Sequence, residues 1–177
     1  MLGTALRYGA ISGGIIVAVL IAGIVATGEH QTQSSIFSTE WFGYTIMLVA
    51  LSTIFLAVRD YRNNTLGGVI KFLPALGLGL SIAFVAGLAY VIGWEIYLYA
   101  THYTFADHYA AAIIEHARQA GTSAEAAAAE AESFKEMYAN PLVRAPMTFL
   151  EIFPVGVLIA LISAAVLRNP RVLPARA

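Results

Sequence analysis

Two glutamates in otherwise apolar stretches are the residues of this sequence best placed to carry chemistry. Glu95 stands in Gly-Trp-Glu-Ile-Tyr, and Glu151 stands in Phe-Leu-Glu-Ile-Phe-Pro. Exposing a charged side chain to lipid costs roughly 2–3 kcal/mol or more, so an ionisable residue within an apolar span is a candidate for function. Two such carboxyls at similar depth could share a proton or a cation. This pair predicts a candidate site for transport.

A structural interpretation of the same residues is favoured over the functional one. Glu95 follows Trp94 and could sit at a membrane interface, and Glu151 lies near the start of an apolar helix, where the macrodipole favours an anion. Arg144 or His102 could pair with either carboxylate. The candidate functional residues are therefore Glu95, Glu151, Arg144 and His102, and both interpretations stay open.

Other kinds of site lack the residues that they need. The chain has no cysteine, which excludes thiolate metal sites and cysteine nucleophiles. His108 and His116 would lie about 12 Å apart along a helix, too far to share a zinc ion whose ligands lie about 2 Å away. We find no phosphate loop, serine elbow or dinucleotide glycine fingerprint. We expect no metal, no cofactor and no catalytic residue, and an enzyme acting on lipid is the least favoured function.

The elements that must position these residues are membrane-spanning helices. Apolar residues make up 59% of the 177 residues and charged residues 12%, about half the charged share of a soluble domain. A helix of about 20 apolar residues crosses the hydrocarbon core, and the apolar runs lack the alternation of barrel strands. The predicted fold is all-α: one integral membrane domain over residues 1–177, with a four-helix transmembrane bundle. We expect the spans at about 6–27, 41–58, 72–100 and 147–167. The first run is too long for a typical signal peptide, which favours an uncleaved helix.

Basic residues predict the orientation of these spans. With the N-terminus inside, seven of the ten Lys and Arg residues fall in inside segments, as the positive-inside rule requires. Arg144 is the one outside cation near the end of a span. Aromatic residues gather at the predicted outer ends, beginning with Trp41 and Phe42 in the second span and Trp94 in the third. We therefore expect a multi-pass protein of the bacterial inner membrane with both termini in the cytoplasm.

Small residues at four-residue spacing predict how the spans pack, because they let helices approach closely in lipid. The first, third and fourth spans are interpreted as the tight core, and the second as more peripheral. Pro154 predicts a kink in the fourth span. The small-residue stripes are Ala10, Gly14, Ala18, Ala22 and Ala26 beside Gly9 and Gly13; Ala75, Gly79, Ala83 and Gly87; and Gly156, Ala160 and Ala164.

The outer loop, residues 101–146, has room for two extramembrane helices between spans three and four. Thr104 can start the first helix and Gly121 can end it. Thr122 and Glu125 have the spacing of a capping box for the second, which Asn140-Pro141 would stop. The second helix has an apolar stripe of Ala127, Ala131, Phe134 and Tyr138. The pair is expected to form a hairpin or to lie on the membrane surface.

Several motifs along the chain resemble a known family. They include Arg-Asp-Tyr-Arg-Asn-Asn-Thr-Leu-Gly-Gly-Val-Ile from residue 59, Gly-Trp-Glu-Ile-Tyr around Glu95, and Asn-Pro-Leu-Val-Arg-Ala-Pro-Met-Thr-Phe-Leu-Glu-Ile-Phe-Pro-Val-Gly from residue 140. Together they resemble domain-of-unknown-function family 4199. The resemblance implies a bacterial four-span membrane protein and no assigned activity.

The function predicted from these observations is a non-enzymatic one. We expect the outer loop and the spans to contact a membrane-protein partner or another copy of the chain, with the lipid bilayer as surroundings and no nucleic acid. The alternative is a transporter or channel component that moves a proton, cation or small solute through the acidic pair.

Overall fold

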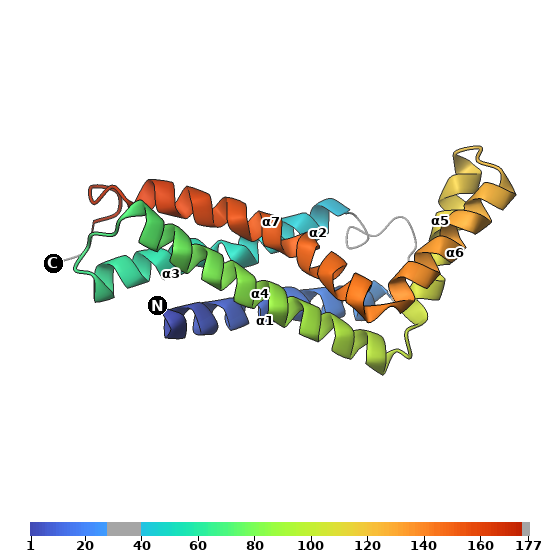
Figure 1. The fold of residues 1–177 in the computed structure, drawn as a ribbon, viewed down its shortest axis with the longest axis horizontal. Helices are drawn as coiled ribbons and strands as arrows, with labels where there is room; N and C mark the ends of the chain where they lie inside the picture. Colours follow the sequence, from blue (N-terminus) through green and yellow to red (C-terminus); the bar gives the residue numbers. More distant parts are fainter. Residues whose placement is uncertain (28–39, 175–177) are drawn as a thin grey trace. The chain divides into compact units, whose positions relative to one another are not determined.

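The chain folds into helices throughout the part that is described. A computed structural model describes residues 1–27 and 40–174, with side chains for 1–23 and 43–174 (Figure 1). No strand occurs within these residues, so the predicted all-α class is confirmed. The prediction that Trp41 and Phe42 lie at an outer interface falls on residues outside the described side chains. The elements are α1 (Leu2–Thr27), α2 (Glu40–Leu51), α3 (Thr53–Asp60), a π-helical turn (Tyr61–Thr65), α4 (Phe72–Ala100), α5 (Thr104–Gln119), α6 (Ala124–Ala139) and α7 (Pro141–Leu167).

Four helical segments are long and apolar enough to cross a membrane, as predicted. They are Leu2–Gly23, Gly43–Thr65, Phe72–Ala100 and Pro141–Leu167. The largest differences from the predicted bounds are at the end of the second segment and at the start of the fourth. The second segment continues past residue 58 through Arg59 and Arg62, and the fourth begins at Pro141, so that Arg144 lies within α7.

The described residues cluster into two compact units, which are treated separately below. The bundle unit comprises Met1–Gly93 and Phe149–Ala177, and the hairpin unit comprises Trp94–Thr148.

Glycines bring the helices of the bundle unit into close contact. A Cβ atom on Gly79 of α4 would lie 2.7 Å from Ala160 Cβ of α7, and one on Gly156 would lie 2.6 Å from Ala83 Cβ. No side chain fits on either glycine at such distances, so α4 and α7 approach with a glycine of one helix against an alanine methyl group of the other. The predicted stripes of the third and fourth spans therefore form the α4–α7 contact.

The prediction holds for the first span only through its Gly9–Gly13 pair, and it was wrong for the second span. In α1, Ala10 and Gly14 are exposed, and the accompanying Gly9–Gly13 pair makes the contact with α4 instead. A Cβ on Gly9 would meet Val85, and one on Gly13 would meet Ala86 and Ala89. The second span is central, because Ile54, Ala57 and Val58 are fully buried. Alanine and glycine are so frequent in α1 that spacing could not distinguish its two small-residue faces.

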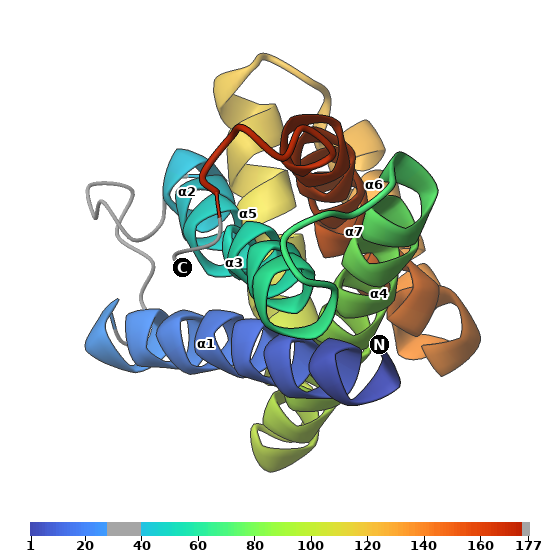
Figure 2. The ribbon, with the colours of Figure 1, turned by 90° about the vertical axis from the view of Figure 1, so that its left-hand side faces the viewer.

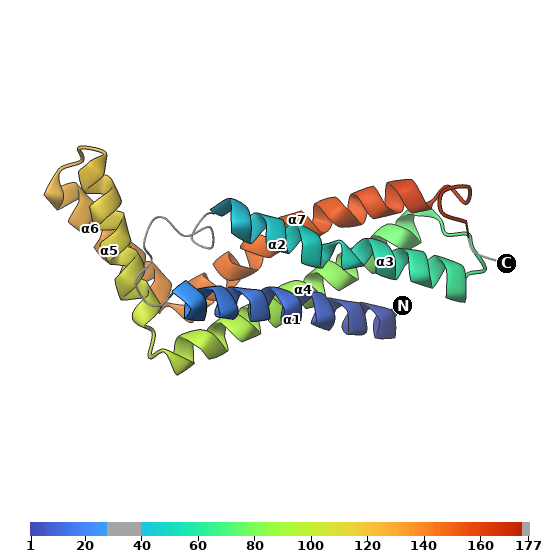
Figure 3. The ribbon, with the colours of Figure 1, turned by 180° about the vertical axis from the view of Figure 1, so that it is seen from behind.

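A hydroxyl pair joins α1 to the break between α2 and α3. Ser12 Oγ and Thr53 Oγ1 are hydrogen-bonded to each other, and each also donates to a carbonyl of its own helix, Tyr8 and Ala50 respectively. Ser52 likewise bonds to the carbonyl of Val49. Hydroxyls that bond back to the preceding turn bend helices, which accounts for the break at Ser52. Figure 3 shows α1 running beside α4 and the α2–α3 pair.

Arg62 ties the π-helical turn to the chain that follows α7. Its guanidinium is fully buried and donates to the carbonyls of Leu167, Val172 and Leu173. These are carbonyls at and beyond a helix C-terminus, where a cation is favoured. Gly67 and Gly68 have φ of 67° and 96° and form the predicted turn into α4. Figure 2 views this end of the bundle unit.

The hairpin unit holds two antiparallel helices of 16 residues each, α5 and α6. Ser123, and not Thr122, caps α6 by accepting a bond from the Ala126 amide. Ala127, Ala131 and Tyr138 are buried, so the predicted stripe of α6 packs inward. Asn140 accepts a bond from the Leu142 amide and Pro141 begins α7. The Asn-Pro pair thus ends one helix and starts the next, since proline suits a first helical position.

Candidate functional site

Glu95 and Arg144 form a two-pronged ion pair inside the hairpin unit. Arg144 Nε donates to Glu95 Oε1 at 2.7 Å, and Arg144 Nη2 donates to Glu95 Oε2 at 2.7 Å. The Arg144 side chain is 4% exposed and that of Glu95 30%. Parallel bonds from a planar fork to both carboxylate oxygens are the strong geometry for this pair. The structure therefore joins two of the predicted site residues.

The remaining surroundings of Arg144 are backbone and aromatic rings. Its Nη1 donates to the carbonyl of Tyr138 at 2.8 Å. The guanidinium carbon lies 5.2 Å from the ring centre of Tyr103 and 5.6 Å from that of Tyr138. Both distances allow a cation–π attraction. Arg144 thus joins the start of α7 to the end of α4, the end of α6 and the α4–α5 turn.

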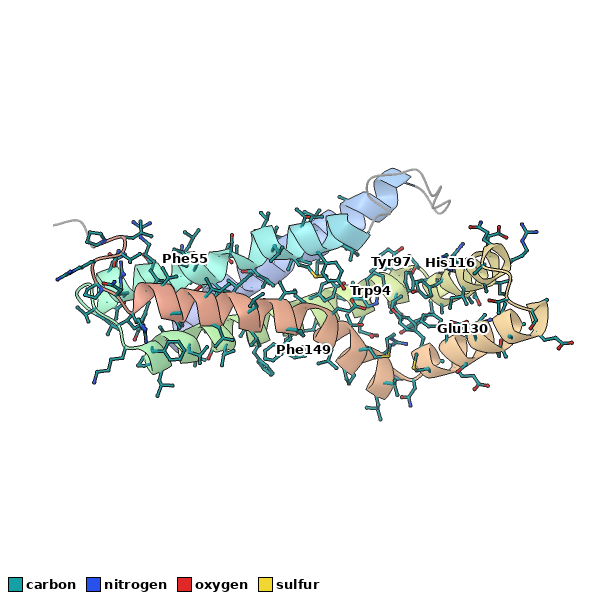
Figure 4. All side chains as sticks on the ribbon, turned by 90° about the horizontal axis from the view of Figure 1, so that it is seen from above. Phe55, Trp94, Tyr97, His116, Glu130 and Phe149 are labelled. Atoms are coloured by element: carbon teal, nitrogen blue, oxygen red, sulfur yellow. The ribbon has the colours of Figure 1, made fainter. Side chains whose placement is uncertain are left out.

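An aromatic cluster forms the interior of the hairpin unit next to this ion pair. Trp94 Nε1 donates to Tyr138 Oη at 2.7 Å. Trp94 stacks on Tyr97 at 5.2 Å between ring centres and meets Phe105 edge-on at 5.0 Å. Figure 4 shows Trp94 and Tyr97 side by side. The cluster continues into the hairpin, because Phe134 lies against Tyr109 of α5 and Tyr138 of α6.

A groove of about 470 Å³ opens beside the ion pair, within the hairpin unit. Glu95, Tyr103, Tyr138 and Arg144 line it together with Ala106, Asp107, Lys135, Ala139 and Pro141. Lys135 of α6 reaches Asp107 of α5 at 2.8 Å across this groove. The Lys135 hydrogen bond, helped by charge attraction, lowers the pKa of the Asp107 carboxyl. The same bond raises the pKa of Lys135.

Glu151 lies in the bundle unit and has a different partner. Tyr90 of α4 is buried, at 4% exposure, and its Oη donates to Glu151 Oε2 at 3.3 Å. The Glu151 side chain itself is on the exposed surface of α7. Each predicted glutamate therefore accepts bonds within its own unit, Glu95 from Arg144 and Glu151 from Tyr90.

His102 is placed in the short turn between α4 and α5. It is exposed, and its backbone has a φ of 51°. Within the described residues, the cation on Glu95 is Arg144 and not His102. The same part of the chain contains no group of three His, Asp or Glu side chains that could hold a metal ion.

Sequence reasoning missed several partners in these contacts. Tyr90 lies in an uninterrupted apolar run, where no period distinguishes it from its neighbours. Asp107 and Lys135 are 28 positions apart, and only the pairing of α5 with α6 brings them together. The inward position of Tyr138 was predictable, because it is the last residue of the predicted apolar stripe of α6.

The contacts of Arg144 are of the kind that holds helix ends together. All of the bonds described for its guanidinium go to groups of the same unit, and both oxygens of Glu95 are engaged. Such a pair fixes the ends of α4, α6 and α7 against one another. Of the two predicted carboxylates, Glu151 is the one that is classed as exposed.

Fold and composition define a class, that of multi-pass all-helical membrane proteins with four spans. Residues 7–169 match the family model described as "Protein of unknown function (DUF4199)". The match covers nearly the whole chain, so the chain belongs to this family, and the predicted resemblance is confirmed. No curated protein and no solved structure matched the chain.

Proposed function

We propose that this chain is a non-enzymatic protein of the bacterial inner membrane, with both termini in the cytoplasm. Its α5–α6 hairpin lies outside the bilayer on the opposite side. The hairpin and the spans contact another membrane protein or a second copy of the chain. The observation that carries this proposal is the hairpin unit, which is folded around its own aromatic core and presents an acidic outer surface.

The division of side chains in the hairpin supports a contact role. Its inward residues are alanines and aromatic rings, whereas its acidic residues are exposed. Figure 4 labels Glu130, one of these exposed acids. The exposed acids are Asp107, Glu115, Glu125, Glu130, Glu132 and Glu136. A surface of this kind favours a partner with basic or polar groups, because opposite charges steer encounter.

The distribution of basic residues supports the proposed orientation. Seven of the ten Lys and Arg residues fall in the inside segments, as the positive-inside rule requires. Arg144, which is paired with Glu95 at 2.7 Å, is the single cation near an outer span end that departs from this rule.

Proteolysis of sealed spheroplasts tests the orientation. Protease added outside should cleave between α5 and α6, near Gly121, and should spare the tail that follows Leu167. Permeabilised cells serve as the control, because there the tail becomes accessible. Cleavage of the tail and protection of the hairpin in sealed cells would reverse the proposed topology.

A photo-crosslinking amino acid placed on α6 tests the contact role. Position 130 is exposed, and position 127 in the same helix is buried at 1% exposure. In native membranes, a crosslinker at Glu130 should yield an adduct of raised mass, and one at Ala127 should not. Absence of adducts at positions 125, 130 and 132 would contradict a contact role for the hairpin.

Support for the transport alternative is confined to Glu151. Glu95 already engages both oxygens with Arg144, so it is a poor partner for a transported proton or cation. Proton uptake by vesicles containing the purified protein, lost on Glu151→Gln, would favour that alternative over the present proposal.

A further inference from the structure

The groove of the hairpin unit is lined by as many cations as anions. Arg144 and Lys135 contribute the positive charges, and Glu95 and Asp107 contribute the negative ones. A ligand with a net charge of either sign meets two groups that repel it, whereas a ligand that carries both charges can place each one beside an opposite charge. The charge balance of the groove therefore favours a zwitterion.

Arg144 keeps N–H donors that its bonds within the protein do not use. Nη1 donates to the carbonyl of Tyr138 and Nη2 donates to Glu95. Each of these nitrogens carries a second N–H, and no residue of the described part of the chain accepts from it. The side chain is 4% exposed and lines the groove. An acceptor oxygen on a ligand in the groove would complete the bonding of this guanidinium, and phosphate is an acceptor that arginine binds well.

The two carboxylates of the groove remain open to a cationic group. The Glu95 side chain is 30% exposed and that of Asp107 is 66% exposed. A carboxylate oxygen can accept more than one hydrogen bond, so the bonds from Arg144 and Lys135 do not exhaust either group. An ammonium ion carries donors and no acceptor, which makes it the matching group for this part of the groove.

Backbone strain beside the groove supports a binding role. His102 and Tyr103 have φ of 51° and 61°, in the left-handed region that residues other than glycine seldom adopt. Such conformations are costly and cluster at binding sites. The strained turn holds the Tyr103 ring 5.2 Å from the guanidinium carbon of Arg144, where the ring forms part of the groove lining.

The groove lies where two spanning helices end. Glu95 is five residues before the last residue of α4, and Arg144 is three residues after the first residue of α7. These helices have 29 and 27 residues, more than the about 20 that cross the hydrocarbon core, so their ends reach the headgroup layer. The zwitterions present in that layer are phospholipid headgroups.

We propose that this groove binds the phosphoethanolamine headgroup of a phospholipid. The phosphate accepts hydrogen bonds from Arg144 and Lys135, and the ammonium group donates to Glu95 and Asp107. Lys135 exchanges its bond to Asp107 for one to the phosphate at little cost, because both side chains of that pair are substantially exposed. The groove volume of about 470 Å³ lies within the range of small-molecule sites, roughly 300–1,000 Å³. Neither the orientation of the spans nor a protein partner enters this inference, so it stands or falls separately from the contact role of the hairpin.

Native mass spectrometry of the full chain in detergent tests the class of ligand. Phosphatidylethanolamine, phosphatidylcholine and phosphatidylglycerol with the same acyl chains are titrated separately. Phosphatidylethanolamine should bind about tenfold more tightly than the other two, the effect of losing hydrogen bonds to charged groups. The choline headgroup has no N–H donor, and the glycerol headgroup has no cation. Binding of phosphatidylglycerol as tight as that of phosphatidylethanolamine would overturn the zwitterion. Equal binding of the choline and ethanolamine lipids would overturn the ammonium contacts.

A double substitution tests whether the lipid lies in the groove. Asp107→Asn combined with Lys135→Gln removes one charge of each sign and should abolish the preference for phosphatidylethanolamine. Glu115→Gln combined with Arg118→Gln is the matched control, because this exposed ion pair belongs to the same unit and does not line the groove. The control should keep the preference. A preference that persists in both double variants would overturn the groove as the site. Unchanged tryptophan fluorescence checks that each variant folds.

A soluble headgroup and a smaller groove complete the test. Glycerophosphoethanolamine has the same headgroup without acyl chains and should bind at least about tenfold more weakly than the lipid, because it buries no apolar chain. Equal affinity would overturn a lipid as the occupant. Ala106→Leu narrows the groove without changing its charge and should weaken the binding of phosphatidylethanolamine. Full binding in this variant would also place the lipid outside the groove.

Discussion

Arg144 and Glu95 are 49 residues apart in the chain and face each other through two parallel hydrogen bonds of 2.7 Å. The contact joins the beginning of α7 to the end of α4 within the hairpin unit. An ion pair that is mostly withdrawn from solvent is costly to break at one side, because the remaining charge is left unmatched.

Removing one member of this pair should destabilise the hairpin unit more than removing both. Glu95→Gln is expected to cost about 2–3 kcal/mol, below the roughly 3–5 kcal/mol of a fully buried pair because Glu95 is partly exposed. Glu95→Leu combined with Arg144→Met should cost less than either single change. Unfolding in denaturing detergent, followed by tryptophan fluorescence, provides the measurement. Additive effects of the two changes would show that the pair contributes no coupling energy.

The α4–α7 contact should be sensitive to a single methyl group. Gly79→Ala places a Cβ 2.7 Å from Ala160 Cβ, and overpacking of this kind costs about 1–3 kcal/mol. Gly77→Ala is the matched control in the same helix, because a Cβ there meets nothing within 4 Å. Unfolding midpoints of the two variants should therefore differ, with Gly79→Ala the lower. Equal midpoints would mean that α4 and α7 separate at little cost.

The hairpin should loosen at low pH through Asp107. Its pKa is lowered in the folded state by the Lys135 hydrogen bond. The stabilisation is therefore complete above the ordinary aspartate pKa of about 3.9 and is lost as the pH falls through the lower folded value. Hydrogen exchange of α5 and α6 amides between about pH 5 and pH 2.5 would measure it after correction for intrinsic rates. The effect should be small, because both side chains are substantially exposed.

Glu115→Gln provides the control for this pH dependence. The pKa of Glu115 is also lowered, by hydrogen bonds from Gln119 and Arg118, but these partners belong to the same helix. Asp107→Asn should remove the acid sensitivity of the α5–α6 contact, and Glu115→Gln should leave it in place. Acid sensitivity that survives in Asp107→Asn would assign it to another group.

The tail after α7 should depend on Arg62. Arg62→Lys loses the planar fork that reaches the carbonyls of Leu167, Val172 and Leu173, and lysine does not replace such geometry. Loss of one bond to a charged donor, about 1.5 kcal/mol, should speed tryptic cleavage at Arg168 and Arg171 by about tenfold in detergent. Arg7→Lys, at an exposed arginine, should leave the rate unchanged. Equal rates in the two variants would show that Arg62 does not hold the tail.

Composition and the spacing of apolar residues were enough to predict part of this structure. Long apolar runs identified four spans, and the α6 stripe identified the inward side of the hairpin. The predicted fourth span begins at 147, six residues after the start of α7 at Pro141, because the uninterrupted apolar run begins only after Arg144 and Pro146. The charge of Arg144 is compensated by Glu95, a contact between distant segments that no local pattern reveals.

The candidate site was predictable in its residues and not in its pairing. Glu95, Glu151 and Arg144 were singled out by type and position, and each takes part in a side-chain hydrogen bond. Which acid Arg144 would meet depends on how α4 and α7 pack. The role of Tyr90 depends on the same packing. Whether these residues carry function stays a prediction.

The Ser12–Thr53 contact has a consequence for how the bundle unit adapts to its surroundings. Each hydroxyl is already bonded to its own helix, and the two meet only at one axial alignment of α1 and α3. Sliding one helix by a turn, about 5.4 Å, would separate them in a solvent that offers no replacement. When bilayer thickness changes, the helices of this unit should therefore tilt together as a block, because slipping past one another is the costlier response.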